Sequence, residues 1–312
     1  MGLLRQSEKL GLPLMNLVRF KGMPILDQLN LEEKLLRTTS DNWCIVNDGA
    51  NAPTVVMGVS GKPAELLELE SVIGDNVPVI KRFTGGGTVI VDEGTIFVTL
   101  ICNKDAVPKV QPYPRSIMSW SGKLYDEVFQ GIGDFQLREN GKQKLSIRNC
   151  FETLPSPPHY LFASAMQPIF QCSKSWCFVL LPDYVFGNRK FGGNAQSITK
   201  DRWIHHTSFL WDYEDRNMTY LKLPSRAPEY RSARDHTEFV CRMREYLQRS
   251  AFIDKTIKAL DNYFMVQPAT PADVNSCQVA KFAHSTRLLS KQELEDACSS
   301  TKPGTIAQSA SI

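Results

Sequence analysis

The 312-residue sequence lacks the features that mark several common classes of protein. No apolar run approaches the length needed to cross a membrane. The net charge of +3 is too small to indicate a nucleic acid or a membrane surface as a partner. Neither a Gly-x-x-x-x-Gly-Lys-Ser/Thr loop nor a strand-turn-helix Gly-x-Gly-x-x-Gly motif is present in its glycine-rich stretch. The length permits one large domain or two modest ones.

Cysteine is present, but in no metal-binding pattern. The eight cysteines stand at irregular positions without a Cys-x-x-Cys pair, and no histidine cluster has zinc spacing. We therefore expect reduced thiols in an intracellular protein, mitochondrial or cytoplasmic, with no tightly bound metal. The first 21 residues carry four basic side chains and one acid. This composition fits either a mitochondrial presequence or a plain basic N-terminus.

Glycine is concentrated between residues 81 and 95, which read KRFTGGGTVIVDEGT. An apolar run precedes the three glycines and β-branched residues follow them, so the sequence predicts a loop between two strands. Consecutive glycines leave backbone N–H groups free to approach an anion, and Arg82 adds a fixed positive charge suited to phosphate. Taken alone, the stretch fits a phosphate site and a plain glycine hairpin equally well.

A second stretch, residues 183 to 196, reads DYVFGNRKFGGNAQ. It predicts a strand, a tight Gly-Asn turn, and then Lys190 followed by a glycine pair, with a further strand over 204 to 210. Taken alone, Lys190 would be an ordinary surface lysine beside a turn.

Together the two stretches resemble the lipoate–protein ligase A-like family, part of the biotin/lipoate ligase group. That family carries an Arg-x-Ser/Thr-Gly-Gly-Gly loop, a Lys-x-x-Gly-x-Ala segment and a His-His strand, and the match in order and spacing covers roughly residues 20 to 240. The resemblance implies an α/β (α+β) catalytic domain with a mixed, mostly antiparallel sheet flanked by helices, as in class II synthetases.

The resemblance also implies a set of site residues. Lys190 would hold the carboxylate and α-phosphate oxygens, and Arg82 would contact the nucleotide phosphate. The remaining wall of the nucleotide and acyl site would consist of Thr84, Gly85, Gly86, Gly87, Thr88, Val89, Ile90, Gly192 and Gly193. Thr95, His205 and His206 are further candidates. Because alternate residues of a strand point to opposite faces, at most one of the two histidines can face the ligand.

The function implied by the resemblance is ATP-dependent activation of lipoate or octanoate, with ATP and Mg²⁺ as substrates. The acyl group would pass to a lysine of a lipoyl carrier domain, in a 2-oxoacid dehydrogenase complex or the glycine cleavage H-protein. Two rivals are an ATP-independent octanoyl or lipoyl transferase and a catalytically silent binding protein. The lack of cysteine between Lys190 and Met218 favours the ligase over a thiol-dependent transferase.

Two departures from the family pattern favour the silent protein. Val91 stands where the family often has an aromatic residue or histidine, and Thr95 stands where it often has asparagine. Biotin ligation fits less well, because the Gly-Arg-Gly-Arg phosphate loop of that branch is absent.

The chain divides into an N-terminal extension (1–20), a catalytic domain (21–265) and a tail (266–312) that we expect to be disordered because it lacks an apolar pattern. Within the domain we expect helices over 25–37, 64–70 and 116–129, and strands over 43–46, 54–57 and 135–138. Residues 141 to 182 interrupt the resemblance with five prolines, three cysteines and one acid. This segment is either a lineage-specific loop or a translated intron, since its ends are compatible with splice-site codons.

Overall fold

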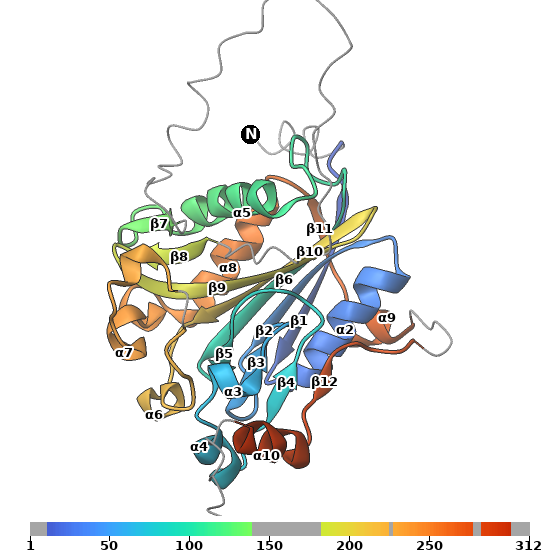
Figure 1. The fold of residues 1–312 in the computed structure, drawn as a ribbon. Coiled ribbons are helices and arrows are strands. Elements are labelled where there is room, and N and C mark those ends of the chain that lie inside the picture. The colour runs from blue at the N-terminus through green and yellow to red at the C-terminus, as the bar shows by residue number, and fades with distance from the viewer. Residues whose placement is uncertain (1–10, 139–181, 225–226, 277–281, 301–312) are drawn as a thin grey trace, which may run out of the picture.

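The computed structural model describes residues 11–138, 182–224, 227–276 and 282–300. Of the expected insertion, residues 141–182, all but residue 182 lie outside these ranges. Two sheets form the centre of the fold, and helices cover both faces of the larger one (Figure 1).

The larger sheet has eight strands in the order β11-β1-β2-β6-β10-β9-β8-β7. Five of its seven strand pairings are antiparallel, and the two parallel ones are those of β1 with β11 and with β2. In chain order the strands are β1 (Leu14–Lys21), β2 (Asn42–Asp48), β6 (Thr95–Asn103), β7 (Phe135–Arg138), β8 (Asp183–Phe186), β9 (Arg189–Ile198), β10 (Arg202–Leu210) and β11 (Met265–Pro268). The expected fold class, a mixed and mostly antiparallel sheet flanked by helices, is confirmed.

Alternation along the central strand β6 assigns the two faces of this sheet. Ile96, Val98 and Leu100 pack with α5 (Pro114–Val128) and α8 (Arg249–Leu260). The intervening residues point the other way, toward α2 (Ile25–Thr38), where Ile101 packs with Leu35. The expected helices over 25–37 and 116–129 are therefore present and lie on opposite faces of the sheet.

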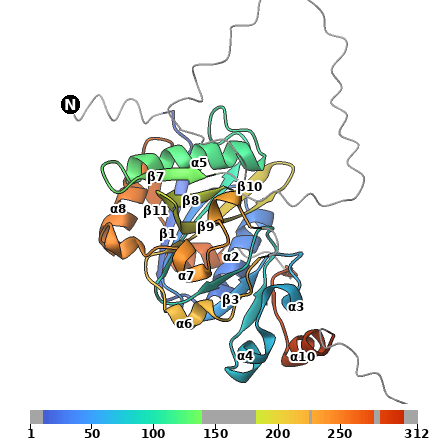
Figure 2. The same cartoon turned by 60° about the vertical axis from the view of Figure 1, so that its left-hand side comes forward.

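The smaller sheet lies on the α2 side and has the order β12-β4-β3-β5. Its strands are β3 (Thr54–Met57), β4 (Val79–Lys81), β5 (Val89–Val91) and β12 (Arg287–Leu288). Beside it lie the short helices α3 (Pro63–Leu66) and α4 (Leu69–Gly74), and α10 (Lys291–Ser299) packs against both. In Figure 2, α4 and α10 lie at the lower right, away from α5 and α8.

The remaining helices belong to the segments after β10 and β11. They are α6 (Asp215–Met218), η2 (Glu229–Arg231), α7 (His236–Phe239), η3 (Met243–Glu245) and α9 (Pro271–Ser276).

The structure differs from the expected domain limits at both ends. Most of β1 falls in the range assigned to an N-terminal extension, and it lies inside the large sheet between β11 and β2. The tail expected to be disordered contains α9, β12 and α10 and most of β11. The short strands β11 and β12 sit at sheet edges and are largely exposed, so backbone hydrogen bonds hold them and no apolar pattern reveals them.

Candidate active site

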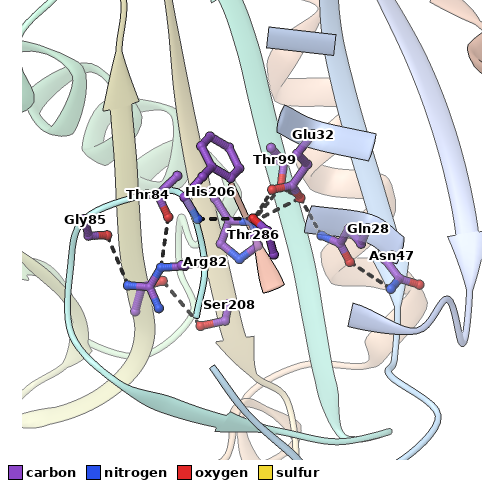
Figure 3. Close-up of polar contacts among 12 residues, drawn as sticks. Gln28, Glu32, Asn47, Arg82, Thr84, Gly85, Thr99, His206, Ser208 and Thr286 are labelled. Carbon is purple, nitrogen blue, oxygen red and sulfur yellow. Dashed lines mark hydrogen bonds and ion pairs between the residues drawn. The ribbon is translucent and has the colours of Figure 1, made fainter. Parts of the chain in front are cut away.

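The glycine-rich stretch forms a loop, residues 82–88, that connects β4 to β5, as the sequence predicts. Arg82 organises this loop from inside (Figure 3). Its guanidinium donates to the carbonyls of Val56 (3.2 Å), Gly85 (3.1 Å) and Gly87 (2.8 Å), and to the Thr84 hydroxyl (2.9 Å). Only 4% of Arg82 is exposed, and burial lowers its pKa to about 10.

These contacts bond Arg82 to the loop itself, and its contact with a nucleotide phosphate stays a prediction. Every one of these hydrogen bonds goes to a neutral oxygen, so the guanidinium shapes the loop and leaves a positive charge beneath it. The negative charge of the buried Glu32 carboxylate acts in the opposite direction and raises the pKa of Arg82, but by less than burial lowers it. The loop is therefore an electropositive, backbone-lined turn, a type of site that suits an anion.

Two glycines are required by close backbone contacts in and under the loop. Gly86 has a φ of +111°, and a Cβ there would lie 2.8 Å from Arg82 Nη2 and 3.1 Å from the Asn194 carbonyl on β9. A Cβ on Gly58, just after β3, would lie 2.3 Å from the Gly86 carbonyl. The loop therefore packs closely between the end of β3 and the middle of β9. Gly58 is required for this packing, although no sequence pattern predicted it.

The other predicted loop residues divide into inward and outward positions. Thr84 and Ile90 are buried, and Ile90 packs in the apolar cluster of the small sheet with Val55 and Val79, so it faces away from the site. Gly85, Thr88 and Val89 are partly exposed and Gly87 is exposed. A Cβ on Gly85 or Gly87 would meet nothing within 4 Å, so open space lies beside this part of the loop.

Lys190 comes close to this loop across the glycine pair of β9. A Cβ on Gly193 would lie 3.7 Å from both Lys190 Cε and Val89 Cγ1, and 3.5 Å from the Ser208 hydroxyl. Lys190 and Val89, the first residue of β5 after the loop, therefore both lie beside the space that glycine leaves at position 193. Gly192 has a different role, since a Cβ would lie 2.9 Å from the Tyr184 ring. The structure thus brings together the loop, Lys190 and Gly193, while Gly192 serves packing.

The Lys190 ammonium has a carboxylate partner that the sequence did not reveal. Its Nζ lies 2.7 Å from Asp183 Oδ1, and the Tyr230 hydroxyl donates to Asp183 Oδ2 at 2.6 Å. Asp183 is at the start of β8 and Tyr230 is in η2. No spacing rule links these positions, because the contact depends on the register between β8 and β9.

His205 and His206 point to opposite faces, as expected for neighbours in a strand. His206 faces α2, where its Nδ1 lies 3.0 Å from Glu32 Oε2 and 3.1 Å from the Thr99 hydroxyl. Figure 3 shows this buried polar network next to the Arg82 loop. His205 faces α5 and contacts Tyr184 and Gln196, and burial lowers its pKa to about 3. Only His206 therefore lies on the face of the sheet that carries the loop.

Thr95 and Cys241 are both engaged in contacts of their own. The Thr95 hydroxyl accepts from the Asp92 N–H within the turn after β5, and Thr95 is 1% exposed. Cys241 donates its N–H to the Lys190 carbonyl at 2.9 Å, but its thiol points toward the Arg189 carbonyl and burial raises its pKa to about 11. In the described ranges, no group of three His, Cys, Asp or Glu side chains is arranged to hold a metal ion.

Comparison with known proteins gives the family context. The family model described as "Lipoyl protein ligase A/B catalytic domain" matches residues 24–265. A Plasmodium falciparum protein named "Inactive lipoate--protein ligase 2" is 30% identical over 241 residues, which is 72% of this chain and 56% of that protein. The chain thus spans little more than half the length of this relative.

Solved structures show the same fold at low sequence identity. A lipoate–protein ligase A bound with ATP superposes with a TM-score of 0.58 at 15% identity, covering 85% of this chain and 92% of that one. The bipartite lipoate protein ligase of Thermoplasma acidophilum, described together with its E2 lipoyl domain, gives 0.56 at 14% identity (85% and 90% covered). P. falciparum LipL1 in complex with lipoate gives 0.53 at 15% identity, covering 84% and 67%. In the part of the chain that the structure describes, no helix is both long and apolar enough to cross a membrane.

Proposed function

Because the chain belongs to the lipoyl protein ligase A/B catalytic-domain family, we propose that it activates lipoate or octanoate with ATP and transfers the acyl group to a protein lysine. The observation that carries this proposal is that Lys190 and Val89, the residue directly after the Arg82 loop, lie on either side of Gly193. A backbone-lined anion site and a lysine ammonium there can hold a nucleotide phosphate and a carboxylate side by side.

The first step joins two anions, and the site residues are suited to that problem. A carboxylate oxygen attacks the α-phosphorus of ATP, the bond to the bridging oxygen breaks, and pyrophosphate leaves. Negative charge builds on the α-phosphate oxygens in the transition state. The Lys190 ammonium and the N–H groups of the loop would stabilise that charge in a site already shaped by Arg82. Mg²⁺ enters with ATP as part of the substrate.

The second step transfers the acyl group to an external nucleophile. The acceptor amine attacks the carbonyl of the acyl-adenylate, AMP leaves, and the amine loses a proton. The acceptor that we propose is the lysine of a lipoyl carrier domain from a 2-oxoacid dehydrogenase complex or the glycine cleavage H-protein. The Thermoplasma acidophilum ligase, which has an E2 lipoyl domain as its partner, supports this partner class.

A transferase that uses a cysteine as acyl acceptor has less support in this geometry. Cys241 is the cysteine next to Lys190, yet the contact runs through its backbone, and its thiol is buried with a pKa of about 11. A thiol of that pKa is almost entirely protonated at neutral pH and is a poor nucleophile.

The second candidate is a catalytically silent member of the family. Two observations favour it: the P. falciparum relative is known as an inactive ligase, and Thr95 is buried within its own turn. A silent protein could still bind a lipoyl group or a carrier domain through the same surface.

An ATP–pyrophosphate exchange assay with lipoate, octanoate and biotin separates these functions. We expect exchange with lipoate or octanoate and none with biotin. If no acid supports exchange, the ATP-dependent proposal is wrong. Incubation with an octanoyl carrier protein and a lipoyl domain, followed by mass measurement of the domain, then distinguishes a transferase from a silent protein.

A further inference from the structure

The ion pair of Lys190 differs from the other lysine ion pairs of the protein. Lys190 and Asp183 have side chains that are only 24% and 12% exposed, and their charged atoms lie 2.7 Å apart. Three other lysine ion pairs in the described ranges have side chains that are 44% to 72% exposed. Exposed pairs of that kind contribute little to stability and fix no geometry, whereas a largely buried pair holds both partners in place.

The register of the β8–β9 hairpin creates this pair. Val185 lies opposite Lys190 and Tyr184 lies opposite Gly192, so β9 contains one extra residue, a β-bulge at Phe191. Residues opposite each other share a face of the sheet, and Asp183 shares the face of Val185 because it is two residues away. Lys190 and Asp183 are therefore diagonal neighbours on one face, within reach of a long side chain.

Tyr230 fixes the other oxygen of the same carboxylate. Its hydroxyl donates to Asp183 Oδ2 at 2.6 Å, the short distance of a charge-assisted bond. Burial, the charge of Asp183 and this hydrogen bond raise the pKa of Tyr230 well above its usual value, so the phenol remains a donor. The η2 turn is itself tied to the hairpin, because Arg234 donates to both the Tyr230 carbonyl (2.8 Å) and the Asn188 carbonyl (2.9 Å).

The backbone of Lys190 is held separately from its side chain. Its carbonyl accepts from the Cys241 N–H at 2.9 Å. Only the side-chain torsions remain to be fixed, and the carboxylate of Asp183 is the group that contacts the ammonium. A lysine ammonium has three N–H donors, so one bond to Asp183 leaves two for a substrate anion.

We propose that Asp183 and Tyr230 are positioning residues for Lys190. Tyr230 orients the Asp183 carboxylate, and the carboxylate holds the Lys190 ammonium in place while leaving two of its donors free. Lys190 Cε lies beside Gly193, as does Val89, the residue that follows the glycine loop. The ligand that fits is an anion presented from the loop side, such as the carboxylate and α-phosphate that meet in acid activation. We call the two contacts, Tyr230 with Asp183 and Asp183 with Lys190, the clamp. The catalytic part of this inference rests on the proposed function, whereas the clamp itself is a property of the folded chain.

The first test measures the clamp without any enzymatic activity. Lysines of the intact protein are acetylated briefly with a small reagent, and mass spectrometry gives the extent of reaction at Lys190 relative to the exposed Lys200. Asp183→Asn and Tyr230→Phe should each raise this ratio several-fold, because the ammonium loses its fixed partner. The matched controls are Asp75→Asn and Tyr220→Phe, which disrupt an equivalent Tyr-to-Asp hydrogen bond of 2.6 Å beside α4.

The second test separates positioning from simple stability. In pyrophosphate exchange, Asp183→Asn should lower kcat about tenfold with little change in the KM of the acid, the pattern expected when an aligned group loses its orientation. Tyr230→Phe should have a smaller effect in the same direction, and the double variant should match Asp183→Asn alone, since both residues act through one carboxylate. Thermal melts of all variants check that each is folded.

The outcomes distinguish a failure of the proposed function from a failure of the clamp. If the wild type shows no exchange with any acid but the labelling ratio rises as described, the proposed function fails and the clamp stands. If the labelling ratio is unchanged in both folded variants, the clamp is wrong. Additive losses of kcat in the double variant would also overturn it, because the two side chains would then act independently.

Discussion

Lys190 is the residue on which the proposed chemistry depends, and its environment allows a clean substitution. Its backbone bond to Cys241 does not involve the side chain, and the ammonium is partly exposed. We expect Lys190→Ala to abolish acyl-adenylate formation while the protein stays folded. The check is the yield of adenylate with thermal melts in parallel, and Lys200→Ala, at an exposed turn, serves as the control. Equal adenylate yields from Lys190→Ala and wild type would remove Lys190 from the mechanism.

Gly86 combines a backbone constraint with a contact to Arg82. At a φ of +111° a branched residue is strained by about 1–3 kcal/mol, and its Cβ would press on the Arg82 guanidinium 2.8 Å away. We therefore expect Gly86→Val to raise the dissociation constant for ATP by about tenfold or more, corresponding to about 1.4 kcal/mol. Calorimetric titration with ATP measures this.

The control for Gly86→Val is Gly131→Val, since Gly131 has a φ of +75° but nothing within 4 Å of a Cβ. It imposes backbone strain far from the loop and should leave ATP affinity unchanged. An unaltered ATP affinity in Gly86→Val would mean that the loop is only a hairpin.

His205 makes the stability of the protein depend on pH. Burial lowers its pKa to about 3, while an unfolded histidine titrates near about 6.5. Between these values the unfolded chain binds the extra proton, so the free energy of unfolding rises with pH, by up to about 1.4 kcal/mol per pH unit from this group. The stabilisation is lost as the pH falls from about 6.5 toward about 3.

His205→Gln should flatten that dependence, since glutamine has no proton to gain. Urea unfolding at a series of pH values between 4 and 7 measures the slope, with the exposed His284→Gln as the control. A variant slope identical to that of the wild type would mean that His205 is not the source of the acid sensitivity.

At the scale of elements, the C-terminal segment supports the nucleotide loop from the side. The Phe83 N–H, next to Arg82, donates to the Thr286 hydroxyl at 3.1 Å, and Glu33 on α2 accepts from the N–H groups of Ser285 and Thr286. Figure 3 shows Thr286 between the Arg82 loop and the Glu32 network. A residue 203 positions further along the chain thus holds the start of the loop.

Thr286→Val tests this support because valine has the shape of threonine without the hydroxyl. The Phe83 N–H would lose its acceptor in a buried position, at a cost of about 1–3 kcal/mol. We expect faster amide hydrogen exchange across residues 82–88 and weaker ATP binding, while Thr286→Ser retains wild-type behaviour. Unchanged exchange in Thr286→Val would show that β12 and the loop are independent.

Side-chain periodicity predicts some elements closely and others not at all. The apolar spacing of α2 and the β-branched run of β3 mark elements that bury a face, and the structure places them where they were expected. By contrast, β11 and β12 are largely exposed and depend on edge pairing with β1 and β4. The start of α10 did carry a local signal, the capping box of Ser290 and Glu293.

The candidate site likewise has parts that the sequence predicts and parts that it does not. The glycine loop and Lys190 could be found because their chemistry is local in sequence. The Asp183–Lys190 pair depends on a β-bulge, and the Glu32–His206 contact joins residues 174 positions apart. Neither arrangement follows from spacing along the chain, because each is fixed only when the strands and α2 pack.

At the scale of the whole molecule, the hairpin formed by β7 and β8 indicates that residues 141–182 are dispensable. Arg138 pairs with Asp183, and the ladder continues regularly to Phe135 and Phe186. Joining Asn140 directly to Asp183 would leave Glu139 and Asn140 as a two-residue loop, the commonest length for a β-hairpin. Asparagine is among the residues that best tolerate the left-handed backbone of such turns.

We therefore predict that deleting residues 141–182 preserves the fold and raises both soluble yield and activity. Shortening a loop changes its closure entropy only logarithmically, so entropy alone would produce a small gain in stability. The deletion joins Asn140 directly to Asp183, the first residue of β8, and it removes an apolar, proline-rich segment that precedes Asp183 in the chain. A large gain would mean that the segment interferes physically with the site. Soluble yield, thermal melts and pyrophosphate exchange of the deletion variant measure these effects, and a matched deletion of 301–312 controls for simple truncation.

Two results would contradict this prediction. If the shortened chain fails to fold, the segment belongs to the core and the regular β7–β8 ladder needs it. If it folds but loses activity, the segment contributes to the site. Transcript sequencing tests the origin of the segment separately: a translated intron requires a spliced message that lacks these codons and exceeds the long form. A message that always contains them would assign the segment to the protein as a loop of its lineage, whatever the deletion does to activity.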